Sequence, residues 1–482
     1  MKRKIIVFYN IVISAIVLFA ITHFDLKESY VLMLLYSLNS TIVFGLLLLE
    51  EINHFRGLNM NLLLIAGCFM RFVLPSISRA WGALNGETYS FLLPENKVTD
   101  YMFPTVVWMN IYYSIFLWCF FKFESKYTFE DIFAPFFIRF KTVRIAVPLF
   151  MVGFAYNIII SFVPSGVIPS VISGILGNMA TLAVIMQLFA AVYKPTSLNR
   201  IIFVVFIVIE IFRTTFFGFY KGAIMINFAY YLLYYFLSRK HEKKSVFTPK
   251  FIVGIVILFA TIDLIIYPFM STKRIVSGWD VTAGGIATQH YSNLDILADV
   301  FSGLSKQDKI ENTAADRLDA VGPNAFFYKE CVMRGLRTTE LVKNNLELLV
   351  PRFINPDKHD SQAGLMVYAY ATTGRFSYYG SAVSNNYIGQ FASAYLIGGG
   401  IMVIILAFFN GWFIMFYYNF LLKHRNNFLA LLFLFPLIMG ALMGFEEIHD
   451  GGALRTAYNS IMMIGIWGMS TIFPRFLTIR TK

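Results

Sequence analysis

Apolar stretches of similar length recur along the chain and are separated by shorter polar ones. A helix needs about 20 apolar residues to cross the hydrocarbon core of a bilayer. Runs near this length predict twelve membrane-spanning helices, at 5–22, 30–49, 60–78, 102–121, 145–163, 167–192, 201–219, 222–237, 250–270, 387–421, 427–445 and 456–473. The 387–421 run is long for one span, so we expect either a tilted helix or a break at Gly398, Gly399 and Gly400.

Residues 271–386 interrupt this pattern and read as ordinary polar protein, holding 24 of the 68 charged residues. Apolar residues recur at helical spacing over 294–304 and 325–350, and Gly322-Pro323 is a start signal for the second helix. The pattern therefore predicts an all-α polytopic membrane protein in three parts. These are transmembrane helices 1–9 in 1–270, a large and mostly helical extracytoplasmic loop in 271–386, and transmembrane helices 10–12 in 387–482.

Composition agrees with a membrane protein, since 57% of residues are hydrophobic and only 14% are charged, against about 25% charged in soluble domains. The apolar start at 5–21 looks like a signal peptide but lacks a small-x-small cleavage site, so we expect a retained first helix. The three cysteines, Cys68, Cys119 and Cys331, are far apart in the sequence and predict neither a disulfide framework nor a metal cluster.

The charge distribution predicts the orientation of the spans. If the spans alternate, the polar stretches on one side hold 21 basic and 6 acidic residues, whereas the large loop holds 12 of each. Cytoplasmic loops carry the excess of Lys and Arg, so both termini are expected in the cytoplasm and the large loop outside. The net charge of +12 then reflects insertion into an anionic bilayer rather than binding to nucleic acid.

Charges within spans are costly and mark candidate functional sites. Arg213 lies inside the 201–219 run, three residues after Glu210, and Lys221 lies at the outer tip of the same hairpin. Two interpretations stay open: an intrahelical ion pair with Glu210, or an Arg213 that faces an outward-open cavity and binds an anion. Arg71 and Asp263 raise the same question and rank below Arg213.

A second group of candidates lies at 351–360, where two prolines stiffen the return of the large loop to the membrane. This turn carries Arg352, Lys358 and His359, and Arg375 follows it. Such a cluster is either solvated surface or a rigid site for an anionic headgroup. The prolines favour the binding site.

A third group lies between the last two predicted spans, where Glu446, Glu447 and His449 precede Arg455. This short outer loop is either solvated or supplies a base beside a cationic pocket. The sequence contains no nucleotide-binding glycine loop, zinc-binding motif or serine-hydrolase elbow, and we expect no cofactor and no metal site.

Arginines at membrane depth suit a lipid-linked phosphate or diphosphate, because the guanidinium matches phosphate oxygens. In glycosyl transfer from such a lipid, fixed cations stabilise the leaving group without a metal, and a carboxylate or histidine orients the acceptor hydroxyl. These residues and the architecture resemble bacterial Wzy-type O-antigen or capsular polysaccharide repeat-unit polymerases. The resemblance lies in Pro351-Arg352 with Lys358, in the runs 381–389 and 396–401, and in the Arg213 hairpin.

The resemblance implies a GT-C-like, inverting and metal-independent glycosyltransferase of the bacterial cytoplasmic membrane. It would move a growing glycan from undecaprenyl pyrophosphate onto another undecaprenyl-pyrophosphate-linked repeat unit at the outer face, with a chain-length regulator as a candidate partner. By this resemblance Arg352 and Arg213 hold the pyrophosphate and Lys358 supports them. The base stays open among Glu446, Glu447, His449 and His359.

Two alternatives share the same lipid-linked sugars. An O-antigen ligase would use the same donor with lipid A core as acceptor. A non-catalytic flippase or exporter would need charges that line a central cavity, for which Arg71, Arg213 and Asp263 are available. Transporters do not need a large outer loop and often show repeat symmetry, which this sequence lacks. We therefore expect the polymerase.

Overall fold

The computed structural model describes residues 2–54, 59–90, 97–124, 142–159, 170–216, 320–335 and 389–424, with Arg337 and scattered single positions at 227–254 and after 424. The predicted spans at 222–237, 250–270, 427–445 and 456–473 lie wholly or largely outside these residues, as does the predicted helix at 294–304. The chain divides into two compact units, one of Met1–Glu130 with Leu318–Lys482 and one of Asp131–Arg317. The three predicted parts stay a prediction.

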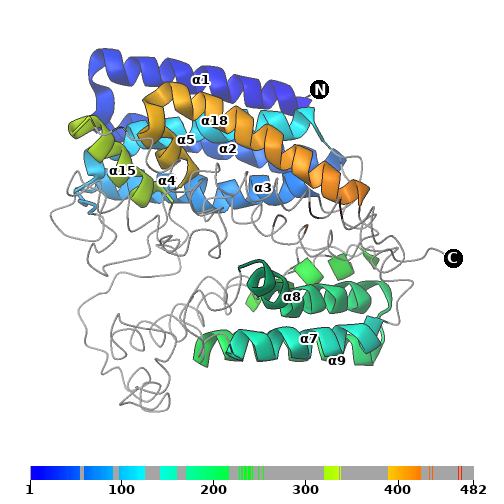
Figure 1. The fold of residues 1–482 in the computed structure, drawn as a ribbon. Helices are drawn as coiled ribbons and strands as arrows, with labels where there is room; N and C mark the ends of the chain where they lie inside the picture. Colours follow the sequence, from blue (N-terminus) through cyan, green and yellow to red (C-terminus); the bar gives the residue numbers. More distant parts are fainter. Residues whose placement is uncertain are drawn as a thin grey trace. The chain divides into compact units, whose positions relative to one another are not determined.

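The first unit is a bundle of apolar helices (Figure 1). In chain order they are α1 (Lys2–Phe24), α2 (Tyr30–His54), α3 (Met60–Cys68), the π-helical turn η2 (Phe69–Val73), α4 (Leu74–Leu84), α5 (Thr99–Lys122), α15 (Val321–Met333) and α18 (Gln390–Lys423). In the part of the chain that is described, five segments are long and apolar enough to cross a membrane: Lys2–Phe24, Tyr30–Ile52, Met60–Leu84, Thr99–Lys122 and Gln390–Lys423. The described elements are helical apart from one isolated bridge between Ser90 and Lys97. The chain is thus a helical membrane protein.

Contacts between helix ends fix the directions of these segments. Arg3 of α1 reaches Glu51 near the end of α2 and Glu124 just after α5, so these three residues mark one end of the unit. At the opposite end Tyr30, which starts α2, donates to Asp100 in the first turn of α5 (2.8 Å). The first four segments therefore alternate in direction, as the orientation argument assumed for them.

Hydrogen bonds between buried polar side chains join α1, α2 and α5 in the interior of the bundle. Asn10 donates to Asn110 and to Ser114, each at 2.8 Å. Asn110 in turn donates to the hydroxyls of Tyr36 (2.7 Å) and Ser40 (2.8 Å). Hydrocarbon offers no competing water, so polar side chains within a membrane bundle pair across helices. The first helix is thereby part of the core.

A proline makes the α3–α4 segment irregular and creates the seat for α15. Pro75 has no N–H, so the carbonyl of Arg71, four residues earlier, lacks its helical donor, and Phe69–Val73 forms the π-helical turn η2. The backbone N–H of Ala320 donates to this Arg71 carbonyl at 2.9 Å. Ala320 is the N-cap of α15, so the polar segment is docked where the spanning helix is interrupted.

α15 corrects one prediction for the polar segment. The helix begins at Val321, close to the predicted start, but it ends at Met333 instead of continuing to 350. Gly335, two residues later, has φ +62°, a left-handed conformation that glycine adopts readily and that commonly terminates helices. The helical spacing of apolar residues beyond this point therefore does not extend the same helix.

The predicted break in the long run is confirmed in α18. Gly398 (φ −160°, ψ 26°) and Gly399 (φ 67°, ψ −156°) have non-helical backbone conformations. Tyr112 of α5 donates to Gln390 (2.5 Å), and Asn410 donates to Tyr112 (3.1 Å). Because residues on both sides of the break reach one hydroxyl, the limb 390–397 folds back beside the limb 400–423. Figure 1 shows this bend.

The second unit is described through α7 (Thr142–Ile159), α8 (Ser170–Tyr193) and α9 (Ser197–Phe216), which match three of the predicted runs. A Cβ on Gly153 of α7 would lie 2.2 Å from the backbone nitrogen of Ala180, so the approach of α7 to α8 requires glycine there. Gln187 donates to the carbonyl of Asn199 (2.9 Å) and fixes the turn between α8 and α9.

Candidate functional site

One of the ten predicted site residues, Arg213, belongs to the described part of the chain. The others lie outside it: Lys221, Arg352, Lys358, His359, Arg375, Glu446, Glu447, His449 and Arg455. Their assignment stays a prediction.

Arg213 of α9 forms an ion pair on its own helix. Its Nη2 lies 2.7 Å and its Nε 3.1 Å from Glu210 Oε2, and both side chains are largely buried, at 18% and 8% exposure. Of the two interpretations that the sequence left open, the structure therefore shows the intrahelical ion pair between Arg213 and Glu210. An anionic ligand on the Nε–Nη2 edge of Arg213 would have to compete with this carboxylate, which already engages both donors of that edge.

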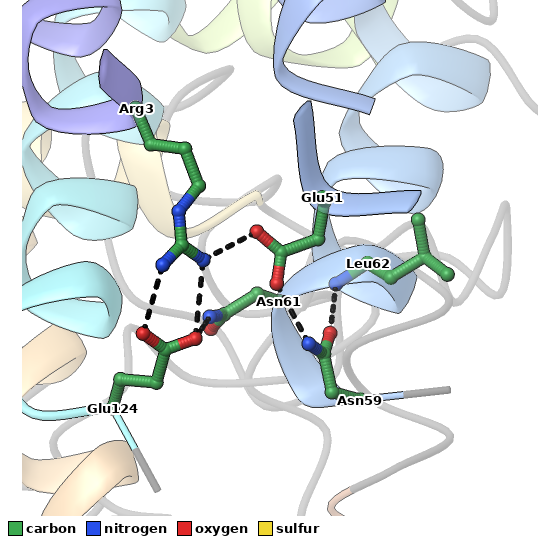
Figure 2. A network of polar contacts seen from close by, with 6 residues as sticks. All are labelled: Arg3, Glu51, Asn59, Asn61, Leu62 and Glu124. Atoms are coloured by element: carbon green, nitrogen blue, oxygen red, sulfur yellow. Dashed lines mark hydrogen bonds and ion pairs between the residues drawn. The ribbon is translucent and has the colours of Figure 1, made fainter. Parts of the chain in front are cut away.

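A polar cluster at one end of the first unit joins four elements (Figure 2). We call Arg3, Glu51, Asn59, Asn61 and Glu124 the Arg3 cluster. Arg3 Nη1 donates to Glu51 (2.6 Å) and Glu124 (3.1 Å), and Nη2 donates to the second oxygen of Glu124 (3.0 Å). Asn61 donates to Glu124 (2.9 Å).

The remaining member links the cluster to the start of α3. Asn59 is the N-cap of α3, where its side-chain oxygen accepts from the Leu62 N–H (2.7 Å), an arrangement that stabilises a helix start. Its amide nitrogen donates to Glu51 (2.7 Å). The Glu51 side chain has no exposed surface, so its charge is matched by partners inside the protein. The two carboxylates of the cluster are thus bound by Arg3, Asn59 and Asn61, and this arrangement suits a structural connection between helix ends.

A second cluster forms at the opposite end, where α5, α15 and α18 meet. We call Trp108, Tyr328, Arg337, Tyr395 and Gly399 the Arg337 cluster. The Arg337 guanidinium carbon lies 5.1 Å from the centre of the Tyr395 ring, and Nη1 donates to the carbonyl of Cys331 (3.3 Å). Tyr395 packs edge-on against Tyr328 (4.8 Å between ring centres) and Trp108 (5.9 Å).

Hydrogen bonds order the Arg337 cluster further. The Tyr328 side chain interacts with those of Trp108 and Tyr395, and the Tyr395 side chain also interacts with Arg337. Trp108 and Tyr395 come from predicted spans and Tyr328 and Arg337 from the predicted outer loop. The cluster therefore fixes the polar segment against the membrane helices.

Charged groups flank this cluster on α15. Glu330 is buried, and its Oε2 lies 2.8 Å from Nε of Arg334. Burial raises the pKa of the neighbouring Cys331 thiol to about 12, while the charge of Arg337 lowers it and that of Glu330 raises it. Arg337 itself is exposed. The arrangement offers an exposed arginine just beyond the end of α15, with the Glu330 carboxylate on that helix.

Sequence analysis missed Arg337, because it is one of 12 basic residues in the polar segment. The one available signal was the three-glycine break in α18, whose second glycine lies beside the guanidinium: a Cβ on Gly399 would be 3.3 Å from Nη2 of Arg337. Within the described ranges, no group of three His, Cys, Asp or Glu side chains is arranged to hold a metal ion. Comparisons of the chain with protein-family models, with curated proteins and with solved structures found no match.

Proposed function

We propose that the protein polymerises undecaprenyl-pyrophosphate-linked oligosaccharide repeat units into O-antigen or capsular polysaccharide. The observation that carries the proposal is the broken α18, whose break at Gly398 and Gly399 lies within the run 396–401 that carries the family resemblance. The polar segment is docked on this break through α15 and Arg337. Interrupted helices at membrane depth occur where protein or a cavity covers the backbone.

The proposed reaction joins two lipid-linked sugars at the outer ends of the spans. The acceptor hydroxyl oxygen attacks the anomeric carbon of the donor, the bond from that carbon to the diphosphate oxygen breaks, and the hydroxyl proton passes to a base. Arginines stabilise the negative charge that grows on the leaving diphosphate. Arg352 and Arg213 are proposed for this role with Lys358 in support, and the base belongs to one of the outer loops.

The positions of the membrane helices and of α15 support this proposal. Five apolar segments supply the membrane body, and α15 brings residues of the polar segment to the end of the bundle opposite the Arg3 cluster, where Tyr328 contacts Tyr101 in the first turn of α5 (6.5 Å between ring centres). A lipid-linked substrate presents its diphosphate at the level of the headgroups. Its sugar extends into water, where a polar cap can hold it.

A deletion strain separates the polymerase from the ligase. Loss of a polymerase leaves core capped with single repeats, whereas loss of a ligase leaves bare core. Complementation with Arg352→Ala should give single repeats at unchanged protein level in the membrane. The matched control is Arg200→Ala, because Arg200 is half-exposed and lies 3.8 Å from Glu242. Normal polymer ladders from Arg352→Ala would count against the assignment.

Purified protein separates the polymerase from a transporter, in which broken helices also occur. The protein is incubated with lipid-linked repeat units in detergent, where no membrane barrier exists, and the products are resolved by glycan length. A polymerase lengthens the glycan and releases undecaprenyl diphosphate. A flippase leaves the glycan length unchanged, and that result would overturn the proposal.

A further inference from the structure

We infer that Arg337, seated on the Tyr395 ring beside the break in α18, binds the diphosphate of the polyprenyl-linked donor. The inference rests on the proposed function for the identity of the lipid. It adds a binding residue that the sequence resemblance does not indicate. The inference stands on the position, accessibility and fixed orientation of the guanidinium.

The guanidinium is held in place before any ligand arrives. The Tyr395 ring lies under it at 5.1 Å, and the Cys331 carbonyl accepts from Nη1 at 3.3 Å. A flexible arginine loses conformational entropy when it binds a ligand, and a pre-ordered arginine loses less. The planar fork of arginine also matches two phosphate oxygens at once.

Gly399 keeps the backbone of α18 close to this guanidinium. Its φ of +67° is a conformation that residues with a side chain rarely adopt. An added Cβ would lie 3.3 Å from Nη2, which is tighter than nine in ten contacts of this kind. A side chain at position 399 would therefore strain the break, and the guanidinium would have to shift by a few tenths of an ångström.

The location suits the headgroup of a lipid. Tyr328 of the same cluster contacts Tyr101 in the first turn of α5, next to Asp100, which accepts from Tyr30 at the start of α2. Tyr328 thus lies where a spanning helix begins, and Trp108 lies about two and a half turns further along the same helix. Tyrosine and tryptophan are enriched at this depth, and the exposed Arg337 is accessible to a ligand that stays in the bilayer.

A second arginine provides a matched control at the same end of the bundle. Arg79 of α4 lies 4.4 Å from the centre of the Tyr89 ring, so its geometry resembles that of Arg337 and Tyr395. The Tyr89 hydroxyl, however, donates to the carboxylate of Glu87 at 2.6 Å. An acid already lies beside this pair, and the pair is therefore a poorer place for an anionic ligand.

The test measures binding by the full-length protein in nanodiscs of zwitterionic lipid. Undecaprenyl diphosphate is titrated against the unmodified protein, Arg337→Gln, Arg337→Lys and Arg79→Gln, and bound lipid is counted by native mass spectrometry. Loss of a charge-assisted contact should weaken binding by Arg337→Gln about 10- to 100-fold. Arg337→Lys should lie between, since lysine keeps the charge without the fork. Arg79→Gln should bind as the unmodified protein does.

Competition by inorganic diphosphate and by phosphatidylglycerol identifies what Arg337 recognises. Competition by inorganic diphosphate that disappears in Arg337→Gln supports a site for the diphosphate itself, and failure of inorganic diphosphate to compete supports a site that requires the lipid as well. Equal competition by phosphatidylglycerol would overturn the inference, because the site would then accept any anionic headgroup. Gly399→Ala should weaken binding together with Arg337→Gln if the break positions the guanidinium.

The outcomes separate the inference from the proposed function. Tight binding by both the unmodified protein and a folded Arg337→Gln would overturn the role of Arg337 and leave the polymerase proposal standing. Absence of binding by the unmodified protein would overturn both. Folding of each variant is checked by its elution profile and melting temperature.

Discussion

Replacement of Arg3 by glutamine should destabilise the first unit strongly, because it leaves a carboxylate buried without its cation. The Glu51 side chain has no exposed surface, the Arg3 side chain is 12% exposed, and Glu124 is 21% exposed. Removing one partner of a buried ion pair costs about 3–5 kcal/mol. The partly exposed contact with Glu124 adds less than about 1 kcal/mol. We expect a loss of roughly 3 kcal/mol in the free energy of unfolding, or a fall in Tm of roughly 5–10 °C.

The chain carries its own reporter for this measurement. Its cysteines are Cys68, Cys119 and Cys331, and all three are free and buried. A dye that fluoresces on reaction with thiols therefore gives little fluorescence with the folded protein, and its fluorescence increases as unfolding exposes the cysteines. The melting curve is recorded in one detergent at one protein concentration for every variant, so that the differences between variants report on the side chains.

Two variants test the reasoning from opposite directions. Lys2→Gln removes a charge next to Arg3, but Lys2 is 80% exposed and lies 3.8 Å from Glu50, so the change should cost less than about 0.5 kcal/mol. Arg3→Gln combined with Glu51→Gln removes both charges and should melt at a higher temperature than Arg3→Gln alone. If Arg3→Gln and Lys2→Gln melt alike, the Arg3 cluster does not hold the helix ends together.

Four further outcomes follow from the same structure. Arg213→Gln removes the cation that lies 2.7 Å from the Glu210 carboxylate, which is only 8% exposed, and should lower the amount of folded protein. Adding Glu210→Gln should restore that amount, and polymer formation that returns with it would exclude Arg213 as a phosphate ligand. At pH 8 the Cys331 thiol, whose pKa burial raises to about 12, should react with maleimide at least about tenfold more slowly than in denaturant, where the pKa is about 8.5. Fast labelling, measured by mass spectrometry, would contradict the burial. Because the folded pKa lies above the unfolded one, the contribution of this thiol to stability is complete below about pH 8.5 and is lost as the pH rises from there toward 12. Pro75→Ala supplies a helical N–H donor for the Arg71 carbonyl, which now accepts from Ala320. The competition should weaken the docking of α15 by about 1 kcal/mol, so that Cys331 is labelled about fivefold faster. An unchanged labelling rate would refute the proposed docking of α15. Polymerisation should persist in EDTA within about twofold, since arginines can stabilise the leaving group alone; a loss of activity that a divalent ion restores would refute that mechanism.

The bounds of the spanning helices were predictable because length and apolarity determine them almost alone. The runs predicted at 5–22 and 102–121 correspond to α1 (Lys2–Phe24) and α5 (Thr99–Lys122). The break in α18 was predictable for a similar reason, since three consecutive glycines favour non-helical backbone at any depth. Both predictions depend on local sequence.

The contacts of the clusters were not predictable, because they depend on which distant residues meet. Arg3 and Glu124 are 121 positions apart, and the orientation argument counted both as charges of one membrane face without pairing them. The position of Arg337 depends on the end of α15 at Met333, earlier than predicted. The helical spacing over 325–350 predicted a longer helix, because spacing alone does not register the stop that Gly335 provides.

Breaks in the spanning helices explain the position of α15 at both of its ends. In a membrane protein every break in a helix exposes backbone groups that lipid cannot satisfy, so other parts of the chain must cover them. At its start, the N–H of Ala320 donates to the carbonyl of Arg71, whose i+4 residue is Pro75 and has no N–H. Just beyond its end, Arg337 lies over the break at Gly399. Two interruptions in separate spanning segments thus define where α15 and Arg337 dock, and the second is the reason that we propose Arg337 as a ligand of the lipid diphosphate.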